Sequence, residues 1–191
     1  MNKNFLIKSY LRLVLFRRTE RCEHSKCWWI NFVISTRVCF PYSLGILRVL
    51  DFVSFPNRRL CARKLSMIVI RHCRRLKSLP KRMHTLLPSL EFLQLKECPE
   101  LESFLEGCLP LSLKTLWIFF YDKLISHHME WGLQSLHFLR DFRIQCKCKE
   151  LESCPEEMLL PRNLSNFHFY SFPNLKSLNY KGFQQLTSLK S

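Results

Sequence analysis

The stretch LSMIVIRHCRRLKSL at residues 65–79 recurs as LEFLQLKECPELESF at residues 90–104. Leucine, isoleucine or phenylalanine occupies the same repeating positions in both stretches, and Cys73 and Cys98 fall at the same place. Later copies keep this spacing, the fourth with one extra residue, and a sixth copy begins close to the last residue. The copies start at residues 65, 90, 113, 139, 164 and 189, so their starts are 25, 23, 26, 25 and 25 residues apart. Chance does not explain five copies in register.

The form L-x-x-L-x-L-x-x-C/N-x-x-L at a period of 20–29 residues is that of a leucine-rich repeat. The two apolar residues of L-x-L point to one face of a short strand, because side chains alternate along a strand. The Cys position turns the chain inward, and Tyr121 and Phe172 replace it in the third and fifth copies, which predicts differently built turns there. Pro80 and Pro155 disfavour a regular helix in the returning segment. The pattern predicts an α/β leucine-rich-repeat solenoid, with a curved parallel sheet and an irregular or 3₁₀ convex side.

The predicted repeat domain covers residues 44–191 and is best defined from about residue 61 onward. A degenerate earlier copy lies at residues 44–52, and we expect Leu50 and Phe52 to be the inward residues of its strand. Residues 1–43 form a basic segment with aromatic residues that does not follow the repeat, so no structure is assigned to it.

Basic residues are concentrated at the front of the chain. The chain has 30 Lys and Arg and 15 Asp and Glu. Residues 1–82 hold 19 of the basic and 3 of the acidic residues, and residues 83–191 hold 11 of the basic and 12 of the acidic ones. The net charge of +15 therefore belongs to the front alone. A solvated segment is the favoured interpretation. The alternative is binding to nucleic acid or an anionic surface, with arginines on phosphates and Trp28 and Trp29 as stacking platforms.

The residues around the apolar strand positions are expected to face the concave surface of the sheet and to bind a partner protein. Those between the two apolar residues are Val69, Gln94, Trp117, Arg143 and His168. Those just after are Arg71, Lys96, Phe119, Gln145 and Tyr170. This mixture of aromatic side chains and arginine is typical of protein interfaces.

No catalytic apparatus, cofactor site or metal site is predicted. Three short runs contain metal-ligating residue types but lack a complete ligand set: Cys22-x-His24-x-x-Cys27 with Cys39, Cys146-x-Cys148 with Cys154, and His127-His128. The 10 cysteines do not suggest a secreted disulfide framework, because the chain has enough apolar residues to build a core. No apolar run reaches the roughly 20 residues of a membrane-spanning helix.

The repeats at residues 87–104, 113–118 and 172–178, and the strand at residues 47–52, resemble those of plant intracellular nucleotide-binding leucine-rich-repeat disease resistance proteins. The C-x-x-L-x-S-[LF] cadence at Cys73 and Cys98 is fairly specific to that family. The resemblance implies a cytoplasmic protein whose partner is a pathogen effector, a guarded host protein or another domain of the same receptor. The family's phosphate loop, G-x-x-x-x-G-K-[ST], is absent, so nucleotide binding is not implied and the chain is expected to be a truncated piece of such a receptor.

Poor solubility of the isolated chain is expected, because the last copy lacks a polar cap and terminal repeats need one. Size-exclusion chromatography over a range of concentrations checks this. Concentration-dependent association is the expected result, and a sharp monomer peak at high concentration would contradict it.

Overall fold

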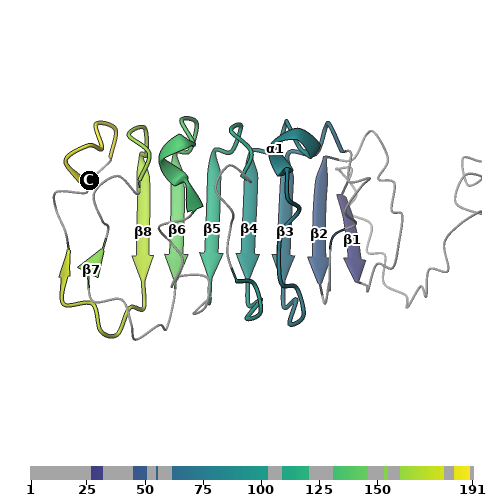
Figure 1. The fold of residues 1–191 in the computed structure, drawn as a ribbon, viewed down its shortest axis with the longest axis horizontal. Coiled ribbons are helices and arrows are strands. Elements are labelled where there is room, and N and C mark those ends of the chain that lie inside the picture. The colour runs from purple at the N-terminus through teal and green to yellow at the C-terminus, as the bar shows by residue number, and fades with distance from the viewer. Residues whose placement is uncertain are drawn as a thin grey trace, which may run out of the picture.

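The computed structural model describes residues 27–31, 45–50, 55, 62–102, 109–120, 131–145, 153–154, 160–178 and 183–189. Within them, seven parallel strands form one sheet in the order β1-β2-β3-β4-β5-β6-β8. The strands are β1 (Cys27–Asn31), β2 (Ile46–Leu50), β3 (Met67–Arg71), β4 (Phe92–Lys96), β5 (Thr115–Phe119), β6 (Asp141–Gln145) and β8 (Asn166–Tyr170). They lie side by side in sequence order along the long axis (Figure 1), which confirms the predicted leucine-rich-repeat solenoid.

Each strand pairs with the next one at the same position of the repeat. Ile68 of β3 lies opposite Leu93 of β4, and Leu93 lies opposite Leu116 of β5. The same register continues to Phe142 and Phe167. A slip of one residue would turn every apolar side chain to the other face of the sheet, so the leucine pattern fixes this register.

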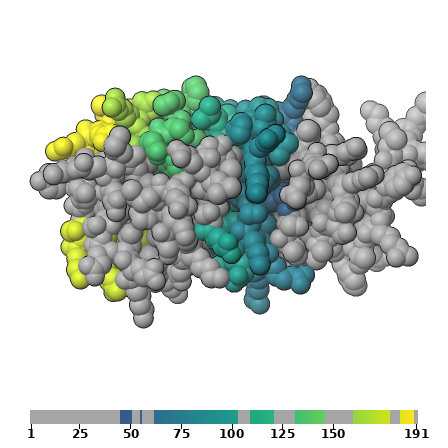
Figure 2. Space-filling model, in the orientation of Figure 1, coloured from purple at the N-terminus to yellow at the C-terminus, as the bar shows by residue number. Residues whose placement is uncertain are grey.

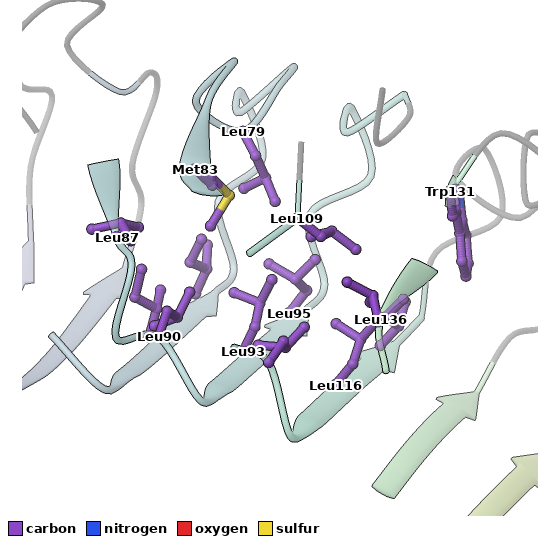
Figure 3. Packing of buried hydrophobic residues seen from close by; sticks show 14 of the residues in the cluster. Leu79, Met83, Leu87, Leu90, Leu93, Leu95, Leu109, Leu116, Trp131 and Leu136 are labelled. Atoms are coloured by element: carbon purple, nitrogen blue, oxygen red, sulfur yellow. The ribbon is translucent and has the colours of Figure 1, made fainter. Parts of the chain in front are cut away.

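The apolar side chains form one buried cluster behind the sheet. The first leucine of each of the five copies has no exposed surface: Leu65, Leu90, Leu113, Leu139 and Leu164. Figure 3 shows Leu93 and Leu95 of β4 on the same side of the sheet as Met83 and Leu109 from the returning segments. Full burial of such a side chain contributes about 1.5–3 kcal/mol. Because each repeat buries its leucines against the next, the core continues from β2 to β8 in the described residues.

The chain turns inward after each strand in a shared geometry. The residue before the Cys position has a positive φ in four copies: His72, Glu97, Phe120 and Ser171, with φ of 54°, 56°, 64° and 59°. In three of these residues the backbone N–H donates a hydrogen bond to the backbone carbonyl oxygen of the last strand residue of the next copy, with N···O distances of 2.7–3.0 Å. That extra interstrand bond offsets the cost of about 1–3 kcal/mol that a left-handed non-glycine residue carries.

The cysteines stabilise this turn, as the sequence predicted. Cys73 and Cys98 are fully buried, and their thiols donate to the carbonyl oxygens of Arg71 and Lys96 at 3.3 and 3.5 Å. Phe172 fills the corresponding place in the fifth copy by stacking on Phe169, with ring centroids 3.6 Å apart. Two positions that the sequence singled out, Tyr121 and Pro155, lie outside the described residues.

The returning side of the solenoid has little regular structure. Its described elements are the four-residue helix α1 (Met83–Leu86), the 3₁₀ helix η2 (Leu133–Ser135), and a two-stranded sheet of β7 (Ser153–Cys154) and β9 (Ser177–Leu178). Pro80 is buried just before α1, consistent with the predicted interruption of helix. In the space-filling view the repeats succeed one another along the long axis in chain order (Figure 2).

The expected strand of the early copy at residues 44–52 was placed three residues too late. Its strand is β2, and its inward residues are Leu47 and Val49; Leu50 is only half-buried, and Phe52 lies outside the described residues. Leu47 pairs with Ile68, so the copy aligns 21 residues ahead of the one at Leu65. In the sequence, both pairs are apolar residues two positions apart, so either pair could form the inward face of the strand. The pairing of β2 with β3 selects Leu47 and Val49.

The sheet also extends into the segment to which the sequence assigned no structure. β1 pairs in parallel with β2, and Trp28 and Ile30 take the register positions of Leu47 and Val49. A tryptophan at the first apolar position conceals the leucine signature. The division of the chain at residue 44 stays a prediction, but the parallel sheet begins before it.

We expect Leu95→Ala to lower the free energy of unfolding by about 2–5 kcal/mol, because it opens a cavity in the continuous core. Leu111→Ala is the matched control, since Leu111 is 57% exposed and the same change there should stay within about 0.5 kcal/mol. Urea denaturation followed by circular dichroism measures both. Equal losses in the two variants would contradict the assignment of the core.

Candidate protein-binding surface

The sheet face that points away from the leucine core is called here the open face. On β5 and β6, buried residues alternate with partly exposed ones, and the partly exposed ones form the open face. The register aligns these side chains in three rows across β3, β4, β5, β6 and β8. The first row is Met67, Phe92, Thr115, Asp141 and Asn166. The middle row is Val69, Gln94, Trp117, Arg143 and His168. The last row is Arg71, Lys96, Phe119, Gln145 and Tyr170.

All ten residues predicted for partner binding lie in the middle and last rows, so the structure brings them together on one face. The first row was missed. The two-residue alternation of a strand reaches back one further position, to the residue just before the first strand leucine. Extending the alternation to that position would have identified Phe92 and Asp141 from the sequence.

Trp117 lies at the centre of the open face and is held by four neighbours. The ring of Phe92 meets it edge to face at a centroid distance of 4.9 Å, and Phe119 does so at 6.3 Å. Its indole Nε1 donates to Oδ1 of Asp141 at 3.1 Å. The guanidinium of Arg143 lies over its ring, 4.5 Å from the centroid. We refer to Trp117 with these four residues as the Trp117 cluster.

Asp141 connects the polar part of this cluster. Its two carboxylate oxygens accept hydrogen bonds from Nε and a terminal nitrogen of Arg143, at 3.0 and 2.9 Å. This paired geometry suits the planar arginine fork and fixes the guanidinium against the indole. The hydrogen bonds with Asp141 raise the pKa of Arg143 above its ordinary value, outweighing the opposing effect of burial. The arginine therefore stays charged while it stacks on Trp117.

A second aromatic pair lies at the end of the described sheet. The rings of His168 and Tyr170 stack with an interplanar angle of 6° and a centroid distance of 5.8 Å. A hydrogen bond of 3.1 Å joins the Tyr170 hydroxyl and His168 Nδ1. Tyr170 is among the exposed large side chains of the described residues, so this pair extends the aromatic part of the open face to β8.

Two residues of the middle row are nearly buried although they point away from the core. Val69 is 5% and Gln94 is 7% exposed. The side-chain oxygen Oε1 of Gln94 accepts a hydrogen bond from a terminal nitrogen of Arg71 at 3.1 Å. The floor of the open face at β3 and β4 is therefore nearly buried and made of one apolar and one polar side chain, with arginine and lysine at its margin.

The described residues contain no group of three or more His, Cys, Asp or Glu placed to hold a metal ion. Of the metal-ligating runs in the sequence, Cys22, His24, Cys39, Cys146, Cys148 and the histidine pair at 127–128 lie outside the described residues. In the part of the chain that is described, no helix is long and apolar enough to cross a bilayer.

Comparison with known proteins finds a plant relative by sequence and a leucine-rich repeat domain by fold. No protein-family model matches the chain. The chain is 34% identical over 137 residues to a candidate disease resistance protein of Arabidopsis thaliana, a match that covers 72% of this chain and 10% of that protein. Its fold is similar to that of the leucine-rich repeat domain of the type III effector XopL, with a TM-score of 0.59 and 21% identity over 87% of this chain and 59% of that chain. The chain thus spans about a tenth of the plant relative, and the second likeness concerns the fold alone.

We expect Asp141→Ala to lower the free energy of unfolding by about 1–3 kcal/mol, because the donors of Trp117 and Arg143 lose a partly buried acceptor. Glu91→Ala is the matched control. Glu91 pairs with Lys114 at 2.8 Å, but both side chains are about half exposed, so its loss should cost less than about 1 kcal/mol. Urea denaturation of both variants checks this, and a cost at Asp141 no larger than at Glu91 would contradict it.

Proposed function

Because the chain is a leucine-rich-repeat region of the kind found in a plant disease resistance protein, we propose that it binds another protein through its open face, as part of the sensing region of an immune receptor. The observation that carries the proposal is the Trp117 cluster, which presents an indole, two phenylalanine rings and an arginine at the centre of that face. Tryptophan and arginine at the centre of an interface carry a disproportionate share of binding energy.

The rigidity of the cluster supports this proposal. Ordering a flexible side chain at an interface costs about 0.5–1.5 kcal/mol. Trp117 is already fixed by its hydrogen bond to Asp141 and by the ring of Phe92, so a partner would not have to order it. Partly exposed tryptophan and phenylalanine side chains gathered on one face are also a feature of interaction surfaces.

The sheet itself suits recognition rather than catalysis. Repeat domains of this fold generally serve as interaction modules, and stacked strands present side chains of varied chemistry at regular intervals. The partner we propose is a protein: a pathogen effector, a guarded host protein or another domain of the same receptor. We place this activity in the cytoplasm.

Trp117→Ala should weaken binding of a partner peptide about 30-fold, the size expected for the loss of about 2 kcal/mol at a hot spot. Peptides are selected from a random display library against the full chain, and fluorescence anisotropy measures their affinity for each variant. Phe138→Ala is the matched control, since Phe138 is a 58% exposed aromatic residue in the turn before β6 rather than on the open face.

Unchanged far-UV circular dichroism of the Trp117→Ala variant would establish that the loss is local. If the selected peptides bind that variant as tightly as the original chain, or if Phe138→Ala weakens them equally, the open face is not the binding surface.

A further inference from the structure

Charge on the open face is divided between its two halves. The open-face residues of β2 are Ile46, Arg48 and Leu50, in register with those of β3. On β2, β3 and β4 this face carries Arg48, Arg71 and Lys96 and no carboxylate. On β5, β6 and β8 its only charged residues are Arg143 and Asp141, which neutralise each other. The first half is therefore cationic, and the second is aromatic and neutral.

The charge of Arg71 is not balanced by a carboxylate in the described part of the chain. Its one hydrogen-bond acceptor there is the neutral side-chain oxygen Oε1 of Gln94, and its buried Nε has no partner. Nε is enclosed by the protein, so an incoming group would have to reach the guanidinium at its terminal nitrogens, and Arg71 as a whole is only half-buried, which leaves room for that approach. A carboxylate is the natural acceptor, because it matches the guanidinium fork.

Lys96 has a carboxylate neighbour in Glu97, in a partly exposed ion pair of the kind that contributes little. Its ammonium lies 3.5 Å from Oε1 of Glu97, but the other oxygen of Glu97 is 2.7 Å from Nδ1 of His72. Lys96 is in register with Arg71 on the adjacent strand, and adjacent strands lie about 4.8 Å apart. Two cations thus stand side by side above the nearly buried Val69 and Gln94. A nearly buried floor with little water strengthens the attraction of a charge placed against it.

We propose that the half of the open face formed by β2, β3 and β4 binds an extended acidic segment of the partner protein, with carboxylates on Arg71 and Lys96. Alternate side chains of an extended peptide are about 7 Å apart, so roughly four residues cross from β2 to β4. This inference rests on the proposed function and specifies its partner: acidic residues over the first half, and an apolar or aromatic residue against Trp117.

A labelled peptide of eight glutamates is the probe, measured by fluorescence anisotropy with the full chain at low salt. The double variant Arg71→Gln with Lys96→Gln should bind it about tenfold more weakly, because two charge-assisted contacts are lost. The control Arg74→Gln with Arg75→Gln removes the same charge from an exposed turn beside the sheet and should change the affinity less than about twofold. A peptide of eight glutamines should not bind.

Three results would overturn the inference: equal losses in the two double variants, equal binding of the glutamine peptide, or tighter binding of an eight-residue oligothymidylate than of the glutamate peptide. The last would identify the cationic half as a nucleic-acid surface. These failures are separate from a failure of the proposed function. Library peptides that require Trp117 but ignore Arg71 and Lys96 would remove only the acidic segment, whereas peptides that ignore Trp117 would remove the binding face itself.

Discussion

Burial of each repeat's leucines against the next repeat is the interaction on which the whole structure depends. A single strand such as β4, with its turn and returning segment, has an apolar face that it cannot cover alone. Leu93 and Leu95 are fully buried because the neighbouring copies supply the remaining contacts. The same stacking pairs equivalent strand residues of neighbouring copies. Backbone hydrogen bonds between copies therefore continue into the turns after the strands, where one residue has a positive φ.

This stacking leaves the other face of the sheet free to vary. The core side constrains every second strand residue to be apolar, whereas the open face holds cations on β2 to β4 and the Trp117 cluster on β4 to β6. A partner therefore meets a rigid surface whose chemistry is set residue by residue. Recognition by such a surface depends on which side chains stand in register, and not on any single catalytic group.

The fold and ten of the open-face residues followed from the sequence, because both depend on the spacing of leucines. What the sequence could not supply depends on pairing between copies. The strand of the early copy was assigned to Leu50 and Phe52, since only the register with β3 selects Leu47 and Val49. β1 was missed because a tryptophan takes the leucine position. The role of Asp141 also needed the structure, since its partners Trp117 and Arg143 come from two different strands.

Hydroxyl-radical footprinting of the chain, alone and with a selected partner peptide, tests most directly whether the open face is the binding surface. Oxidation of Met67, Phe92 and Trp117 should fall when the peptide binds, because all three side chains belong to that face, while oxidation of the exposed Phe138 should not change. Protection of Phe138 or Leu111, with Trp117 oxidised as before, would contradict the account and place the partner on the turns that precede the strands.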